Sequence, residues 1–224
     1  RQITMTAIAI DGPAGAGKST IARALAQKLG YLYLDTGALY RAIGLYCVER
    51  GVPTGDKAAV TAALDSIDVA LRYVDGAQRV LLNGEDVSEA IRRPEISLAA
   101  SAVSAMDTVR AFLLDLQRDM ARTHDVVMDG RDIGTVVLPD ARVKIFLTAS
   151  LEERTRRRQA EYAAKGEERD FDELLREMDQ RDRQDRTRAV APLRRAEDAV
   201  ELDSTSLSAD EVLAAIESIL KEKA

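Results

Sequence analysis

The chain has 224 residues, 46% of them hydrophobic, which is enough for one sizeable α/β domain. Its formal charge of -6 argues against nucleic acid or an anionic membrane surface as the main partner. No apolar run is long enough to span a membrane, and no basic segment followed by an apolar one opens the chain. The lone Cys47 and the lone His124 exclude an internal disulfide and a zinc site, so both are expected to be structural. We therefore expect a soluble, cytoplasmic protein.

The first predicted elements surround a glycine-rich loop. Its sequence, Gly12-Pro-Ala-Gly-Ala-Gly-Lys-Ser19, fits the phosphate-loop pattern G-x-x-x-x-G-K-[ST] at every specified position. An apolar run from Ile3 to Ile10 predicts a strand before the loop, and apolar residues at helical spacing predict a helix after it. Backbone N–H groups of such a loop, together with the start of the helix, bind phosphate. A glycine-rich turn that merely reverses the chain would need neither these flanks nor the Lys-Ser pair.

The loop residues take distinct roles under this interpretation. Lys18 supplies a positive charge for the β- and γ-phosphates of a nucleotide, and the Ser19 hydroxyl is placed to bind Mg²⁺. We assign nucleotide-phosphate contacts to the whole loop and the residue after it: Gly12, Pro13, Ala14, Gly15, Ala16, Gly17, Lys18, Ser19 and Thr20.

Between residues 31 and 87 the spacing of apolar residues changes from helical to alternating. A short strand at 31–34 ends at Asp35-Thr36-Gly37, and helices follow at about 38–50 and 57–64. From 67 to 87 apolar residues alternate, with turn signals at Asp75-Gly76 and Asn83-Gly84, which predicts an antiparallel meander. Because a meander does not belong in a parallel sheet, we expect one domain over 1–224, with a core of 1–62 and 108–224 and an insert at about 63–107.

The remaining chain returns to strands alternating with helices. Helices are predicted at 94–105 and 107–122, strands at 126–129, 143–147 and 199–202, and helices from Ser150, from Asp170 to Arg188 and from Ser208. The helices from Ser150 and Ser208 each begin with a capping-box pattern. Five strands alternating with helices indicate a doubly wound, mostly parallel sheet. Ligands bind at the carboxyl ends of such strands, which points to the segment from Asp129 to Gly134.

Arginine dominates the basic residues in the second half of the chain. Twelve arginines and ten carboxylates are interleaved between Arg154 and Arg195. Some are expected to form ion pairs on exposed helix faces, and others to bind phosphate with the planar guanidinium group.

Two classes of phosphate-loop protein are compatible with this loop. A guanine-nucleotide switch needs an Asn-Lys-x-Asp motif, but Asn83 is the only asparagine. A kinase with a small phosphate acceptor needs a second anion site, for which the chain offers Arg41, Arg131, Arg181 and Arg188. The kinase is favoured, with a nucleotide-dependent switch or binding protein as the alternative.

Five motifs carry a specific family resemblance. They are Gly12-Pro-Ala-Gly-Ala-Gly-Lys-Ser, Asp35-Thr-Gly-Ala-Leu-Tyr-Arg41, Gly84-Glu-Asp-Val-Ser88, Asp129-Gly-Arg-Asp-Ile-Gly-Thr135 and Arg186-Thr-Arg-Ala-Val-Ala-Pro192. With these motifs the chain resembles the bacterial cytidylate kinase family over nearly its whole length. The resemblance implies a phosphate-loop nucleoside monophosphate kinase fold with a β-containing acceptor insert and a helical lid at about 153–170. It also implies transfer of the γ-phosphoryl group of ATP to CMP or dCMP with Mg²⁺, and we expect a monomer.

The resemblance also implies roles for single residues. Lys18, Arg131 and Arg188 would be catalytic, and Arg158 on the lid would contact ATP. The acceptor phosphate would be bound by Arg41, Arg131 and Arg188. The cytosine would be surrounded by Thr36, Ser101, Arg110 and Asp132, and the sugar would meet Arg181 and Asp185.

Overall fold

The computed structural model describes residues 5–223, which form two compact units. Unit 1 comprises residue 5 and residues 32–126, and unit 2 comprises residues 6–31 and 127–223. Ile3, predicted to start the first strand, lies outside the described residues. The single-domain organisation and the insert boundaries at about 63 and 107 stay a prediction.

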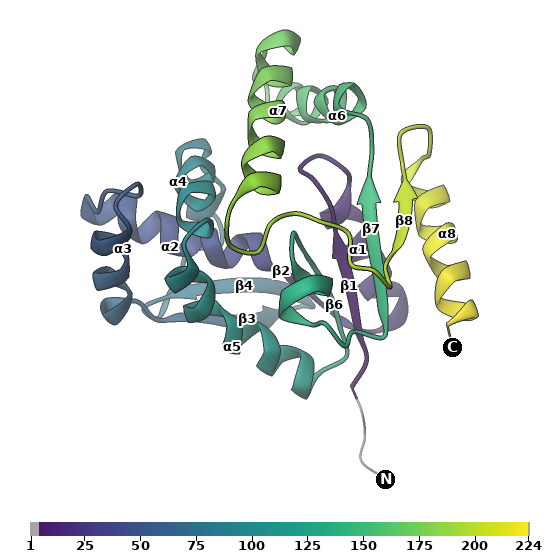
Figure 1. Ribbon diagram of the computed structural model, residues 1–224, viewed down its shortest axis with the longest axis horizontal. Helices are drawn as coiled ribbons and strands as arrows, with labels where there is room; N and C mark the ends of the chain where they lie inside the picture. The colour runs from purple at the N-terminus through teal and green to yellow at the C-terminus, as the bar shows by residue number, and fades with distance from the viewer. Residues whose placement is uncertain (1–4, 224) are drawn as a thin grey trace. The chain divides into compact units, whose positions relative to one another are not determined.

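Unit 2 carries the phosphate loop and most of a parallel sheet (Figure 1). Its elements are β1 (Ala7–Asp11), α1 (Lys18–Leu29), β6 (Val126–Gly130), η3 (Ile133–Val137), β7 (Val143–Thr148), α6 (Leu151–Ala164), α7 (Phe171–Thr187), β8 (Val200–Asp203) and α8 (Ala209–Glu222). The strand order is β2-β6-β1-β7-β8, where β2 is Leu32–Asp35, and the pairs β1–β7 and β7–β8 are parallel. The predicted α/β class with a five-stranded parallel sheet is confirmed.

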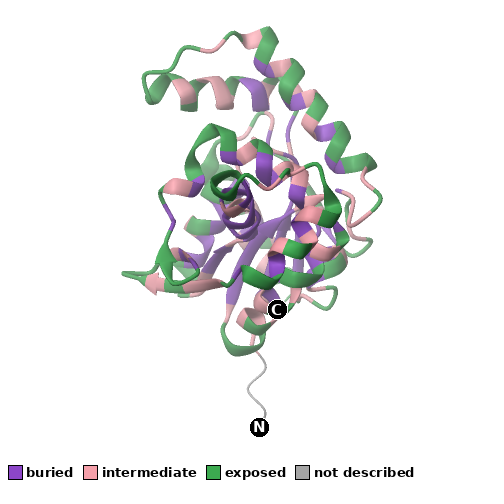
Figure 2. Ribbon diagram, turned by 90° about the vertical axis from the view of Figure 1, so that its left-hand side faces the viewer, coloured by how far each residue is buried: buried purple, intermediate pink, exposed green. Residues whose placement is uncertain are grey.

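The centre of the hydrophobic core in unit 2 lies on β1 and β7. Ile8 pairs with Val143 and Ile10 with Ile145, and none of these four residues is more than 1% exposed. Continuous apolar runs suit parallel strands that are covered on both faces. Figure 2 draws buried residues in purple, and strands of the sheet carry this colour. Helix α1 adds a buried apolar stripe of Ile21, Ala22, Leu25 and Ala26.

The two predicted capping boxes have different outcomes. At α8 the box is complete, because Ser208 and Glu211 each accept the backbone N–H of the other. At α6 only half of it forms: Ser150 accepts the N–H of Glu153 at 3.2 Å. The Glu153 carboxylate instead pairs with two arginines of α6, and the Ser150 N–H donates to Thr205. The Ser150 capping box was therefore wrongly predicted, because the Glu153 carboxylate pairs with arginines and not with the Ser150 N–H.

Unit 1 contains β2, a helical layer and the predicted meander. Its other elements are α2 (Thr36–Arg50), α3 (Lys57–Ala63), η1 (Leu64–Ser66), β3 (Val69–Val74), β4 (Ala77–Leu82), β5 (Glu85–Asp86), η2 (Ala90–Arg92), α4 (Pro94–Ser104) and α5 (Asp107–Thr123). Strands β3, β4 and β5 form a separate antiparallel sheet in that order. Helix α2 begins two residues before the predicted start, because the Asp35 carboxylate caps it by accepting the N–H of Ala38.

The backbone conformation of the two turns in the meander explains why Asp-Gly and Asn-Gly pairs predicted them. Asp75 and Gly76 have φ values of 51° and 77°, and Asn83 and Gly84 have values of 50° and 84°. Two successive left-handed residues are what a tight hairpin turn requires, and Asp, Asn and Gly adopt that conformation at low cost. The Asn83 side chain also accepts the N–H of Asp68 at 2.7 Å and so closes the base of the sheet.

The remaining expectations concern single residues and membrane helices. Cys47 is buried, and His124 follows α5 with its Nδ1 atom 2.8 Å from Thr123 Oγ1. Within residues 5–223, no single helix is long and apolar enough to cross a membrane. The adjacent pair α4 and α5, bent by 99° at the break, reaches the required length and composition only when the two helices are taken together.

Gly12 generates the first prediction. A Cβ atom at this position would lie 1.9 Å from the backbone oxygen of Leu147, and φ is +154°. Gly12→Ala is expected to lower the free energy of unfolding by more than about 3 kcal/mol, because the backbone of β7 or of the loop would have to shift to make room. Gly30→Ala is the matched control: φ is +70° but nothing lies within 4 Å, so the loss should be about 1 kcal/mol. Urea unfolding of both variants measures the difference, and equal losses would contradict the expectation.

Candidate functional site

The phosphate loop of unit 2 connects β1 to α1 with three left-handed glycines. Gly12, Gly15 and Gly17 have φ values of 154°, 76° and 94°. Gly17 is the N-cap of α1 and has no side-chain capping hydrogen bond. Ser19 and Thr20 lie in the first turn of the same helix, and both are exposed. The loop therefore presents the N-terminal end of a helix without a side-chain cap, which is where a phosphate group binds.

Lys18 is the buried cation at the start of this helix. It is 7% exposed, and its Nζ atom donates to the Pro13 carbonyl at 2.8 Å. The pKa of Lys18 is lowered to about 7, mainly by burial and then by the positive charge of Arg131, while the carboxylates of Asp129 and Asp11 oppose the shift. A polyphosphate beside the lysine would favour its charged form again.

Asp11, the last residue of β1, connects the phosphate loop to the segment after β6. Its two carboxylate oxygens accept the N–H groups of Ile133 and Gly134, each at 2.8 Å. Burial raises the pKa of Asp11 to about 6, although both hydrogen bonds lower it. These bonds hold the start of the π-helical turn η3, which directly follows Arg131 and Asp132. Asp132 is itself 4% exposed.

Three of the predicted arginines gather around one carboxylate in unit 2. The Asp185 side chain receives Arg131 Nε at 3.0 Å and lies 3.7 Å from Arg188 Nη1. Burial raises the pKa of Asp185, but the charges of Arg131, Arg181 and Arg188 outweigh that effect and lower it. Three guanidinium groups that act on the same carboxylate make this cluster a candidate anion site.

Arg154 of α6 connects α6 and α7 to the phosphate loop. It forms a buried ion pair with Asp182 of α7 at 2.6 Å, with side-chain exposures of 4% and 6%. The same guanidinium group donates to the carbonyl groups of Ala149 and Ala14, at 2.9 and 3.1 Å. The sequence placed Arg154 on the lid but did not indicate these contacts.

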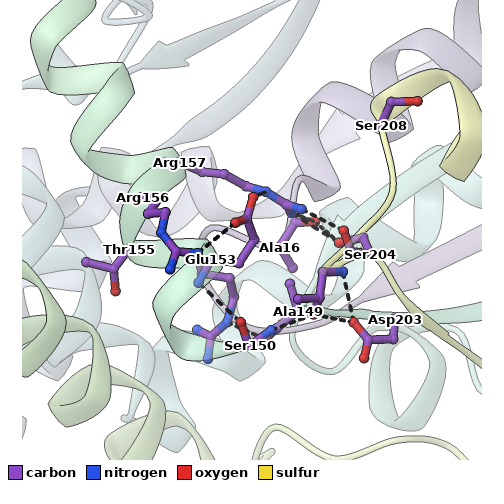
Figure 3. Close-up of polar contacts among 12 residues, drawn as sticks. Ala16, Ala149, Ser150, Glu153, Thr155, Arg156, Arg157, Asp203, Ser204 and Ser208 are labelled. Atoms are coloured by element: carbon purple, nitrogen blue, oxygen red, sulfur yellow. Dashed lines mark hydrogen bonds and ion pairs between the residues drawn. The ribbon is translucent and has the colours of Figure 1, made fainter.

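Arg157 contacts the phosphate loop from the same helix, as Figure 3 shows. Its guanidinium donates to the side chain and backbone oxygens of Ser204 at 3.1 and 2.7 Å, and to Ala16 O at 3.4 Å. Glu153, one turn earlier, accepts Arg157 Nε at 3.1 Å. Arg158, the arginine predicted to contact ATP, pairs with Glu161 at 2.8 Å and stacks on the Tyr162 ring. Arg157 rather than Arg158 therefore lies at the loop in this structure.

Four predicted acceptor-binding residues belong to unit 1. Arg41 Nη2 pairs with Asp35 at 2.8 Å, and Thr36 at the start of α2 is buried. Arg110 is 9% exposed, donates to the Ser104 carbonyl at 2.8 Å and lies over the Tyr40 ring. Ser101 lies on α4, three residues before Ser104, and its carbonyl accepts the Ser104 hydroxyl. Arg110 and Ser101 are thus on adjacent helices of the same unit.

The loop, the buried lysine and the arginine cluster define a class of protein: a phosphate-loop α/β protein that binds nucleotide phosphates. Comparison with known proteins gives the family. The cytidylate kinase family model matches residues 8–222. A cytidylate kinase of Caldicellulosiruptor saccharolyticus is 54% identical over 206 residues, which are 92% of this chain and 91% of that protein. One of Geobacter sulfurreducens is 51% identical over 216 residues, with coverages of 96% and 93%.

The chain belongs to the cytidylate kinase family, and it is an ATP-dependent phosphotransferase. Among solved structures, an uncharacterized protein of Eubacterium ventriosum has a TM-score of 0.56 at 12% identity, with coverages of 97% and 99%. At that identity the likeness concerns the fold only.

The Arg154–Asp182 pair generates the second prediction. Asp182→Asn leaves the Arg154 charge buried and uncompensated, so the free energy of unfolding should fall by about 3 kcal/mol or more. Glu161→Gln is the matched control, since it breaks a pair on the same helix whose side chains are 41% and 57% exposed. That control should lose less than about 1 kcal/mol. Thermal and urea unfolding compare the two variants, and a small loss in Asp182→Asn would contradict the expected cost of the buried charge.

Proposed function

We propose that this enzyme transfers the γ-phosphoryl group of ATP to CMP or dCMP, and that it acts as a cytoplasmic monomer. The observation that carries the proposal is the environment of Lys18. The lysine is buried at the N-terminal end of α1, and burial lowers its pKa to about 7. The charged form of such a lysine is stabilised most by a ligand that carries several negative charges, and the phosphates of ATP carry them.

The arginine cluster supports the proposal of a second phosphate-binding site, which lies in unit 2. We assign Arg131 and Arg188 to the phosphate of the acceptor nucleotide, and Arg181 with Asp185 to its sugar. Phosphoryl transfer needs charge neutralisation and in-line positioning, and the acceptor phosphate is its own nucleophile. The enzyme therefore needs no histidine base, which agrees with a chain whose only histidine, His124, lies at the end of α5.

Unit 1 supplies the other acceptor residues of the proposal. Arg41 is assigned to the acceptor phosphate, and Thr36, Ser101 and Arg110 to the cytosine. A buried Arg41 Nε atom supports the first assignment, because among residues 5–223 no hydrogen-bond partner reaches it. An unsatisfied buried donor is costly, and a phosphate oxygen would satisfy it.

The loop also fits a Mg²⁺ ion that is held mainly by substrate. No group of three or more acidic, histidine or cysteine side chains among the described residues is arranged to hold a metal. Both carboxylate oxygens of Asp11 already accept backbone N–H groups. We assign the Ser19 hydroxyl to the ion, with phosphate oxygens and water as the other ligands, which is how Mg²⁺ is commonly bound. When bound, the ion would neutralise charge on the phosphates.

The third prediction tests the reaction itself. A coupled assay of ATP consumption with CMP, dCMP, UMP, AMP and GMP should show the highest kcat/KM for CMP or dCMP. Lys18→Met, which removes the charge at similar length, should lower kcat by a factor on the order of 10² or more while thermal unfolding changes little. Faster turnover with another nucleotide would refute the assigned substrate. Unchanged turnover in the variant would refute the role of Lys18.

The fourth prediction concerns the choice of base. Cytosine carries an amino donor where uracil carries a carbonyl acceptor, so the buried Asp132 carboxylate should favour CMP. A buried polar group left unpaired costs about 1–3 kcal/mol, which corresponds to roughly a ten- to hundredfold preference over UMP. Asp132→Asn should lower kcat/KM for CMP and narrow the CMP-to-UMP ratio. If Asp132 only orients Arg131, both substrates will lose activity by the same factor and the ratio will not change.

A further inference from the structure

The paired strands of the β3–β4 hairpin direct two polar side chains toward β2. Tyr73 on β3 and Gln78 on β4 are register partners. Directly opposite residues of an antiparallel pair lie on the same face of the sheet. The next positions on that face, Leu71 with Val80 and then Val69 with Leu82, are apolar. Gln78 is therefore an amide at a position where the alternating pattern otherwise places a hydrophobic residue.

Both side chains bind the main chain of β2. The Tyr73 hydroxyl donates to the Tyr33 carbonyl at 2.8 Å. Gln78 Oε1 accepts the N–H of Asp35 at 3.0 Å, and Gln78 Nε2 donates to the Asp35 carbonyl at 3.3 Å. The amide thus engages both main-chain polar groups of one residue, as a neighbouring strand would. Asp35 is the last residue of β2 and is fixed at its backbone by Gln78.

The side chain of Asp35, whose backbone is held by Gln78, in turn binds Arg41. Its Oδ1 atom accepts the N–H of Ala38 and its Oδ2 atom accepts Arg41 Nη2 at 2.8 Å. A Cβ atom at Gly37 would lie 3.1 Å from Asp35 Oδ1 and 3.2 Å from Arg41 Nη1, so the glycine leaves the space that this pair occupies. Asp35 and Arg41 are 16% and 22% exposed at their side chains, so solvent reaches the pair only in part.

We propose that Gln78 is a positioning residue for the acceptor nucleotide, acting through Asp35 on the guanidinium group of Arg41. This inference rests on the proposed role of Arg41 at the acceptor phosphate. Under this proposal the β3–β4 hairpin has a role in substrate binding. The amide of Gln78 positions Asp35, and the Asp35 carboxylate orients Arg41. Gln78 itself touches neither substrate.

The test compares Gln78→Leu, which keeps the size of the side chain and removes both hydrogen bonds, with Arg79→Leu. Arg79 is the next residue on β4 and pairs with Asp86 instead of β2. Gln78→Leu should raise KM for CMP about three- to tenfold, with KM for ATP unchanged and kcat changed less than about twofold. Arg79→Leu should leave all three constants unchanged. Thermal unfolding of each variant checks its folding, and Tyr73→Phe, which removes only the bond to Tyr33, should have a smaller effect in the same direction.

A double-mutant cycle with Arg41→Ala shows whether Gln78 acts through the arginine. In the Arg41→Ala background, Gln78→Leu should change KM for CMP by less than about twofold, because the group that it orients is gone. Full additivity, or an unchanged KM in Gln78→Leu alone, would overturn the inference while the kinase function stands. An unchanged KM in Arg41→Ala would overturn the role of Arg41 and the inference together. Failure of the wild-type enzyme to phosphorylate CMP would refute the proposed function itself.

Should Gln78→Leu fold poorly, Gln78→Glu provides the second measurement. The carboxylate still accepts the N–H of Asp35 but cannot donate to its carbonyl, and it adds a negative charge near the Asp35–Arg41 pair. KM for CMP should rise in this variant as well, with KM for ATP unchanged. A parallel rise in both constants would indicate general damage to the fold and would overturn the positioning role.

Discussion

The structure of unit 2 depends on one buried carboxylate, that of Asp11. Because each of its oxygens accepts a backbone N–H group, Asp11 holds the beginning of η3 against the end of β1. The same strand leads directly into the phosphate loop, so the loop and the Arg131–Asp132 segment share one anchor. Burial raises the pKa of this carboxyl to about 6, and the two N–H groups partly offset the cost of keeping its charge.

The number of arginines around a carboxylate differs between two parts of unit 2. Arg154 and Asp182 form a buried one-to-one pair, with both side chains less than 10% exposed. Around Asp185 the arrangement differs, since the charges of three arginines act on this carboxylate. A cluster of guanidinium groups of this kind is suited to bind a phosphate. Arginines that look alike in the sequence therefore have different surroundings in the structure.

The sequence was most informative where local chemistry determines conformation. The phosphate loop, the left-handed turn residues and the complete Ser208 capping box were all predicted from short patterns, and the structure contains them. The π-helical turn η3 was not predicted, because one turn has no periodicity and depends on Asp11, 122 residues earlier in the chain. Arg157 was not singled out either, since adjacent arginines on a helix point about 100° apart and composition does not say which of them meets the loop.

The contacts of Arg154 and Arg157 have a mechanical consequence for α6. Both arginines donate to carbonyl groups of the phosphate loop, at Ala14 and Ala16, so the first two turns of the helix are fastened to the loop. A rigid rotation of the whole helix would have to break those bonds. Beyond Arg157 the helix has another partner, since Gln159 donates to the Arg169 carbonyl at 2.8 Å. The N-terminal half of α6 is thus held by the phosphate loop, and its C-terminal half by the segment that leads to α7.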